Sequence, residues 1–346
     1  MIRGLRTAAV LAALTAGGSQ MAAATPVEIV RFSDLHGWAD ADHAAALSVF
    51  TASCDAIDGP EWAPLCALAR DGTDARQFFE LFFRPVLIGG PAPALFTGYY
   101  EPELRGARKP DETFRYPIYR KPPELDAGEK WHSRAQIETR GILQDRNLEI
   151  AWVDDPVDVF FLQIQGSGRV RLRDGSALRL GYAGANGHEY RSIGEELVRR
   201  GVYDRHQVSA QVIANWVRRN PEAGRELLHH NPSYVFFREI DHVPPDKGPL
   251  GAMNLSLTAG RSIAVDPEYI PLGAPVWIEK GGRTPMRRLM VAQDTGSAIK
   301  GPRRADIFFG TGAAAGRRAG HVRDAGRMIV LLPIERAFAM AAGGRS

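Results

Sequence analysis

Three aspartates in the last third of the chain have the setting that acid–base chemistry needs. Asp266, Asp294 and Asp306 each stand at one end of a short apolar run. Apolar neighbours raise the pKa of a carboxyl group by excluding water, so that the group stays protonated and can act as a general acid. The structural alternative for each is that it only caps a turn or pairs with an arginine. For any single aspartate this alternative is the favoured interpretation, but it is less favoured for all three together.

Other features of the sequence limit which chemistry is possible. The loop between the last two aspartates carries Lys300, Arg303 and Arg304, which would lower the pKa of a nearby carboxyl group. Asp294 begins the sequence Asp-Thr-Gly-Ser, as in aspartic proteases, but those enzymes need a second aspartate that shares a proton, and no second Asp-Thr-Gly or Asp-Ser-Gly occurs. No His-Glu-x-x-His pattern or metal-binding cysteine pair occurs either, so no metal and no cofactor are expected.

The segments around these aspartates predict a small β-barrel. Short apolar runs separated by Gly and Pro are typical of barrel strands, and one helix is expected among them, at 312–319. The expected strands are 262–265, 275–278, 288–293, 307–309 and 327–332.

The preceding residues mix helices and strands. Helices are expected over 40–53, after an N-cap at Asp74, after a capping box at Ser192, over 209–219 and from Pro221. Strands are expected at 96–102, 148–153 and 157–165, and residues 169–182 alternate around an Asp-Gly turn as a hairpin does.

Several ordered blocks of the sequence resemble one enzyme family. These blocks are FTGYYEP at 96–102, FLQIQGSG at 161–168, YAGANGH at 182–188, YRSIG at 190–194, NPSYVFF at 231–237 and DTGSAIKG at 294–301, followed by Asp306. Together they resemble the membrane-bound lytic murein transglycosylase A family, whose C-terminal part is a three-aspartate domain. The resemblance covers most of residues 95–332.

The resemblance implies a mainly β fold with helices. It implies a double-psi β-barrel formed by residues 25–102 and 236–340, a smaller inserted β-rich domain at 103–235, and a saccharide groove between the two. The implied reaction is cleavage of the β-1,4 bond between N-acetylmuramic acid and N-acetylglucosamine in peptidoglycan without water, which gives a 1,6-anhydro product. Because the nucleophile is the substrate's own 6-hydroxyl, one carboxyl group can serve as acid and then as base.

The same resemblance assigns roles to residues. Asp306 is the expected acid, Asp294 a second catalytic residue, and Asp266 a structural or second-layer residue. The expected substrate-binding residues are Thr97, Gly98, Tyr99, Gln165, Gly166, Ser167, Gly168 and Lys300. The alternative from another functional class is a barrel that binds polysaccharide of the wall without cutting it.

The first 24 residues predict an exported protein. Arg3 and Arg6 precede a short apolar stretch, and Ala22 to Ala24 offer a small-residue cleavage site, as in a secretory signal. No transmembrane segment is expected in the mature chain, and the expected location is the periplasm. The family is usually a lipoprotein, but no lipobox cysteine is present here, so association with the outer membrane stays open.

Charge and cysteine content fit this compartment. The 346-residue chain has 43 basic and 40 acidic side chains, and removal of the leader with Arg3 and Arg6 leaves 41 against 40. A nearly neutral body favours a neutral or mixed-charge ligand over nucleic acid. The only two cysteines, Cys54 and Cys66, are expected to form a disulfide, because the compartment is oxidising and their number is even.

Overall fold

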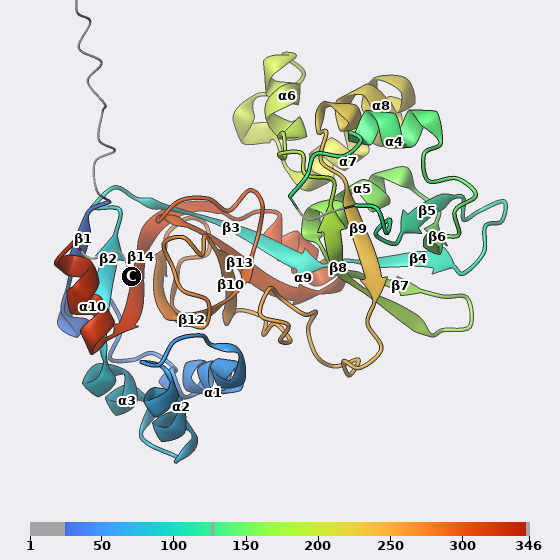
Figure 1. Cartoon of the computed structure of the whole chain (residues 1–346). Helices are drawn as coiled ribbons and strands as arrows, with labels where there is room; N and C mark the ends of the chain where they lie inside the picture. Colours follow the sequence, from blue (N-terminus) through green and yellow to red (C-terminus); the bar gives the residue numbers. More distant parts are fainter. Residues whose placement is uncertain (1–24, 126–127, 344–346) are drawn as a thin grey trace, which may run out of the picture.

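The computed structural model describes residues 25–125 and 128–343, so the leader expected at 1–24 lies outside the described residues. The chain forms two lobes (Figure 1). Strand β3 leads from the first lobe into β4 of the second lobe, and β9 is an edge strand of the second lobe's sheet. Each lobe has its own clusters of buried apolar side chains.

The first lobe contains a closed barrel of six strands. Its sheet has the order β1-β2-β14-β11-β12-β10-β13-β3, and β3 also pairs with β14, which closes the last six strands into a ring. The pairs β10–β12 and β13–β3 are parallel, and the other pairs are antiparallel. The strands are β1 (Val27–Ile29), β2 (Phe83–Ile88), β3 (Ala94–Glu101), β10 (Ser262–Val265), β11 (Pro275–Lys280), β12 (Met286–Thr295), β13 (Arg304–Thr311) and β14 (Arg323–Pro333).

Five α-helices cover the barrel. They are α1 (His43–Ser53), α2 (Ala63–Arg70), α3 (Ala75–Phe82), α9 (Gly312–Ala319) and α10 (Ile334–Ala341). Helix α1 begins where the Asp42 side chain accepts from the Ala45 N–H, and α3 where Asp74 accepts from the Gln77 N–H at 2.8 Å. Such caps each contribute about 1 kcal/mol to helix stability. The helices and the barrel share one core around Phe50, Phe83 and Trp277, none of which is exposed.

The second lobe is a six-stranded sheet with five helices. The strand order is β5-β6-β4-β7-β8-β9. The strands are β4 (Glu103–Ala107), β5 (Tyr116–Tyr119), β6 (Glu149–Val153), β7 (Gly168–Arg171), β8 (Ala177–Ala185) and β9 (Val235–Glu239). The helices are α4 (Arg134–Arg140), α5 (Pro156–Gln165), α6 (Ile193–Arg199), α7 (Ala210–Arg219) and α8 (Pro221–His230). Short 3₁₀ turns lie at Phe32–Asp34, Cys54–Ala56 and Arg205–Gln207.

One expected strand was wrong. Residues 157–165 form most of helix α5, not a strand. The Asp155 side chain accepts from the Val157 N–H at 2.8 Å, Pro156 takes the first helical position, and Gly166 ends the helix in the left-handed region at φ +75°. The run looks like a strand because it is mostly apolar even at its exposed and half-buried positions, such as Ile164 and Phe161, so that α5 has no continuous polar face.

The barrel segments follow the sequence closely. The strand expected at 262–265 and the helix expected at 312–319 have those bounds in the structure. The hairpin expected over 169–182 is formed by β7 and β8, which pair Val170 with Leu178. The short apolar runs separated by Gly and Pro therefore predicted these elements correctly.

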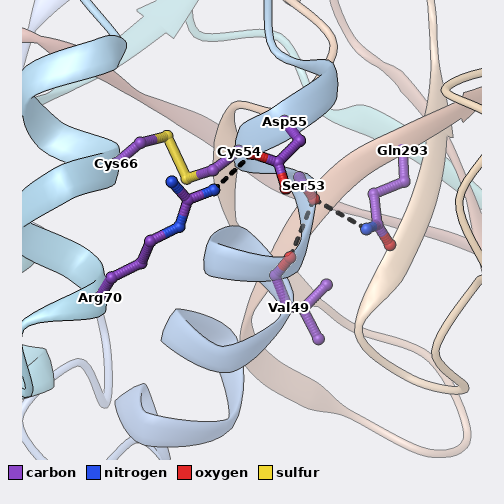
Figure 2. Close-up of a disulfide and its surroundings, with 7 residues drawn as sticks. All are labelled: Val49, Ser53, Cys54, Asp55, Cys66, Arg70 and Gln293. Atoms are coloured by element: carbon purple, nitrogen blue, oxygen red, sulfur yellow. Dashed lines mark hydrogen bonds and ion pairs between the residues drawn. A yellow bond between two sulfur atoms is a disulfide. The ribbon is translucent and has the colours of Figure 1, made fainter.

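A disulfide joins Cys54, directly after α1, to Cys66 in α2 (Figure 2). Beside it, Ser53 Oγ donates to the Val49 carbonyl and accepts a 2.8 Å hydrogen bond from the Gln293 side chain in β12. Helix α1 is thus hydrogen-bonded to β12, the strand that carries Asp294 near its end. Within residues 25–125 and 128–343, no helix is long and apolar enough to cross a membrane.

Candidate active site

The candidate site lies where β3 runs beside β13 in parallel. In this register Thr97 is the neighbour of Asp306, and Tyr99 is the neighbour of Phe308. Strand β10 flanks β13 on its other side, with Ala264 opposite Asp306. Side chains alternate along a strand, so Thr97 and Tyr99 project to the same face of β3. Pairing across a separation of about 200 residues therefore brings the two expected site segments together.

Asp306 is held by a hydroxyl group. The Thr97 Oγ1 donates to its Oδ1 at 2.6 Å. Burial raises the pKa of the Asp306 carboxyl to about 6, while the Thr97 hydrogen bond and the positive charge of Arg304 act in the opposite direction and the charge of Asp294 adds to the increase. A carboxyl group with this pKa is protonated in a large fraction of molecules at mildly acidic pH, as a general acid requires.

Arg304 acts on Asp306 through Thr97. Its guanidinium donates to the Thr97 Oγ1 at 2.8 Å, and it also donates to the Ala305 carbonyl at 2.7 Å. The Thr97 hydroxyl therefore accepts from the cation and donates to the carboxyl group. This arrangement fixes the direction of the hydroxyl proton without a direct ion pair.

Asp294 is held by three donors. Tyr99 donates its hydroxyl to Oδ2 at 2.8 Å, and the backbone N–H groups of Ala252 and Thr295 each donate to Oδ1 at 2.9 Å. Burial raises the pKa of Asp294, and these hydrogen bonds oppose that increase. Burial and the neighbouring carboxylate also raise the pKa of Tyr99 well above its usual value, so Tyr99 keeps its proton.

An apolar cluster includes side chains next to the two half-buried aspartates. It consists of Tyr99, Leu257, Ala264, Ile299 and Phe308, all of them buried, and it is separate from the main barrel core. Tyr99 and Phe308 are in ring contact, with centroids 5.3 Å apart. Apolar surroundings of this kind favour the uncharged form of a carboxyl group.

The loop that presents Ala252 to Asp294 is anchored by the second lobe. Arg169 in β7 donates to the carbonyls of Pro245 and Lys247, and Arg179 in β8 donates to those of Lys247 and Gly248. Both arginines also face the fully buried Glu101 at the end of β3, at 2.8 and 3.7 Å. The hairpin of the insert thus helps to fix one donor of the Asp294 carboxylate.

The expected substrate-binding residues divide into two groups. Thr97 and Tyr99 contact the aspartates directly. Gly98 lies against α9, because a Cβ there would stand 2.8 Å from the Ala319 Cα, so this glycine serves close packing. Gln165 accepts from the Tyr100 N–H at 3.0 Å, which joins α5 to β3.

The remaining expected residues lie around this junction. Gly166 ends α5, Ser167 is buried, and Gly168 has no room for a Cβ beside Leu162. Asp266 is buried and accepts from the Gly301 N–H at 2.7 Å. Lys300 is two-thirds exposed, and its Nζ lies 3.9 Å from Asp266 Oδ1.

Sequence reasoning did not assign roles to Ala252, Glu101, Arg169 or Arg179. The alternation of arginines with apolar residues along the hairpin is a signal that their side chains share one face, but their partners are distant in sequence. No group of three or more potential metal-ligating side chains occurs among the residues that the structure describes.

Comparison with known proteins matches both regions. Residues 95–238 match the family description "MltA specific insert domain", and residues 261–332 match the "3D domain". Membrane-bound lytic murein transglycosylase A of Escherichia coli K12 is 40% identical over 246 residues, which cover 68% of this chain and 65% of that protein. The Vibrio cholerae protein of the same name is 36% identical over 244 residues, covering 68% and 64%. The chain thus spans less than two thirds of these relatives' length.

Solved structures match over a larger share. A membrane-bound lytic murein transglycosylase from Agrobacterium tumefaciens has 35% identity and a TM-score of 0.81, over 91% of this chain and 99% of that one. Escherichia coli MltA with bound chitohexaose has 32% identity and a TM-score of 0.71, over 85% and 90%. The mainly β fold with its closed barrel and second sheet is therefore the fold of these proteins, and the chain belongs to the membrane-bound lytic murein transglycosylase A family.

Proposed function

We propose that this chain is a lytic transglycosylase that cleaves murein glycan strands to 1,6-anhydro products, with Asp306 as the single acid and base. One observation carries the proposal: Asp306 is a half-buried carboxyl group that accepts from the Thr97 hydroxyl at 2.6 Å, and its pKa is raised to about 6 near the carboxyl group of Asp294. The names of the relatives and the chitohexaose bound to one of them support a glycan substrate.

The proposed reaction needs one proton carrier. The Asp306 carboxyl group gives its proton to the glycosidic oxygen as the bond from that oxygen to the muramyl C1 breaks. The muramyl 6-hydroxyl then attacks C1, and its proton returns to Asp306. No water is consumed, and the enzyme returns to its starting protonation state. An intramolecular nucleophile needs no second carboxyl group to activate it, which distinguishes this scheme from the two-carboxylate scheme of most glycoside hydrolases.

Asp294 is suited to a different part of the same step. It accepts three hydrogen bonds, whereas Asp306 accepts one from Thr97. Hydrogen bonds to a carboxylate favour its charged form. We therefore assign to Asp294 the stabilisation of positive charge that develops at C1, and to Asp266 a supporting role under the loop that begins at Lys300.

The domain limits and location belong to the same proposal. We infer a barrel built from residues 25–102 and 236–340 and an insert at 103–235, with the glycan between the two lobes. We also infer an exported, periplasmic protein that acts on peptidoglycan strands. The relatives are named membrane-bound.

The test is the product mixture released from purified murein, analysed by mass spectrometry. The wild type is expected to release muropeptides one water lighter than hydrolysis products. Asp306→Asn should lower the rate by about 10²–10⁴-fold, the usual contribution of general acid–base catalysis. Asp55→Asn, at a largely exposed aspartate, is the matched control and should retain the wild-type rate.

Other outcomes would replace the proposal. Hydrolysed sugar ends would mean that a second carboxylate activates water. Full activity of Asp306→Asn would mean that another residue is the acid. Binding to murein without any release would identify a polysaccharide-binding module.

A further inference from the structure

A large cavity lies in the second lobe, away from the candidate active site. Its volume is about 920 Å³, it is open to solvent on one side, and residues of β5, β6, α4, α5, α7 and α8 line it. None of the three site aspartates lines it. Cavities of this size hold small molecules or short peptides, and the proposed reaction does not use this space.

The walls of this cavity, here called the insert cavity, are aromatic and rigid. Tyr119, Trp152, Phe160 and Tyr234 line it. The buried guanidinium of Arg134 stacks between two of these rings, 4.6 Å from the Phe160 centroid and 5.0 Å from that of Tyr234. Arg134 also donates to Glu138, Gln163 and the Ser233 carbonyl. These contacts hold the wall in one shape, which lowers the cost of ordering on binding.

Charged side chains of both signs line the insert cavity without partners. Arg115, Arg225, Asp145 and Glu149 form no ion pair and no side-chain hydrogen bond within the part of the chain that the structure describes. Arg218 in the same lining is different, because it pairs with Asp155 at 2.6 Å. Cations and carboxylates that do not neutralise one another can bind a ligand that carries both charges. A neutral sugar could form hydrogen bonds to these groups, but it would bring no opposite charge to any of the four.

Helix α5 connects the insert cavity to the candidate site. Its first residues, Pro156 and Val157, line the cavity, and its last, Gln165, bonds to Tyr100 of β3. Ten residues of helix measure about 15 Å. An extended peptide of about four or five residues covers the same distance. A short peptide attached to a glycan beside β3 is therefore long enough to reach the cavity.

We propose that the insert cavity binds a short zwitterionic peptide, namely the peptide stem carried by murein glycan strands. The proposal rests on the proposed function for the identity of the glycan, but it predicts peptide binding by itself. Stem peptides carry free carboxylates and a free amino group, which match the unpaired arginines and carboxylates. Binding there increases the affinity for strands that carry peptides over strands that lack them.

The experiment titrates the full-length protein with a stem peptide by calorimetry. The probe is N-acetyl-L-alanyl-γ-D-glutamyl-meso-diaminopimelate, and the matched probe has its carboxyl groups amidated and its amine acetylated. The wild type should bind the charged peptide at least about tenfold more tightly than the neutral one, a difference of about 1.4 kcal/mol.

Two variants locate the binding site. Arg225→Glu on α8 and Glu149→Lys on β6 should each weaken binding of the charged peptide by about tenfold or more. Arg219→Ala is the control, because Arg219 is an exposed arginine of α7 that bonds only to its own helix and does not line the cavity. Thermal unfolding of each variant checks that the fold is kept.

The outcomes separate this proposal from the proposed function. Absence of peptide binding by the wild type, equal binding of both probes, or unchanged binding by Arg225→Glu would overturn it. Product analysis on murein with the same protein sample tests turnover independently. Peptide binding without turnover would support the peptide site and contradict the proposed reaction. Turnover without peptide binding would support the reaction and contradict the peptide site.

Discussion

The junction between the two lobes and the candidate active site treat charged groups in opposite ways. In the second lobe and at its junction with the barrel, buried ions meet opposite charges: Glu101 faces Arg169 and Arg179, and Arg134 faces Glu138. In the barrel, Asp306 is bonded to a neutral hydroxyl, and the nearest cation reaches it only through Thr97. Direct pairing keeps a group ionised and structural, whereas burial beside a hydroxyl raises the carboxyl pKa and makes it available for proton transfer.

Removal of the junction carboxylate should have the largest effect on stability. Glu101→Ala leaves Arg169 and Arg179 facing a site without its anion, so we expect a loss of about 3–5 kcal/mol in the free energy of unfolding. Glu101→Gln should cost less, because its amide oxygen can still accept from Thr311 and Arg169. Urea unfolding measures both. Arg205→Ala, which breaks an exposed pair with Glu195, should cost at most about 1 kcal/mol.

Removal of the Asp306 carboxyl group should instead increase the free energy of unfolding at neutral pH relative to acidic pH. The Asp306 pKa is about 6 in the folded chain and about 3.9 when unfolded. Ionisation therefore opposes folding: the cost is absent below pH about 4, grows between pH 4 and 6 and is complete above. Asp306→Asn should stabilise the protein at pH 7.5 by about 2–3 kcal/mol more than at pH 4.

Thermal unfolding at the two pH values measures that difference, with Asp55→Asn as the exposed control. An equal effect of Asp306→Asn at both pH values would show that folding does not raise the pKa of Asp306. The contrast between the junction of the lobes and the candidate active site would then lose its basis.

A smaller effect is expected from Arg304. Its positive charge lowers the pKa of Asp306, so Arg304→Gln should raise that pKa. Because the protonated acid is the active form in the first step, the decline of kcat/KM on the alkaline side should move to higher pH. The pH profile of murein cleavage measures this shift. Arg303→Gln, one residue earlier, should not shift the pH profile. An unchanged profile for Arg304→Gln would show that Arg304 does not affect the pKa of Asp306.

The smallest effect is expected at Lys300. Its ammonium is two-thirds exposed and lies 3.9 Å from Asp266. Solvent screens such a pair, so Lys300→Ala should change the free energy of unfolding by at most about 0.5 kcal/mol. A large loss, measured by the same urea titration, would show that the loop after Asp294 depends on this pair.

The sequence predicts the barrel well and the insert less well. Barrel strands and α9 are short apolar runs interrupted by Gly and Pro, and local patterns are enough to find them. Helix α5 is apolar even where it is partly exposed, so its apolar run resembles a strand. The correct signal was the capping aspartate with proline at 155–156. Signals of a helix start therefore indicate secondary structure better than composition does in a mostly apolar segment.

The site was predictable in its carboxyl groups and not in their partners. Asp294 and Asp306 stand at recognisable strand ends. Their environment depends on contacts across long stretches of chain, such as Arg304 with Thr97 and Ala252 with Asp294. No local pattern encodes those contacts, because they arise from barrel closure and from the anchored loop at 244–252.

The most direct test of the account is the ionisation of Asp306 itself. Carbon-13 NMR of aspartate-labelled protein follows each carboxyl group through a pH titration, and Asp306→Asn identifies its signal by subtraction. We predict a midpoint near pH 6 for the Asp306 carboxyl group. A midpoint near 4 or below would show that burial does not keep the group protonated, and would contradict its role as the general acid.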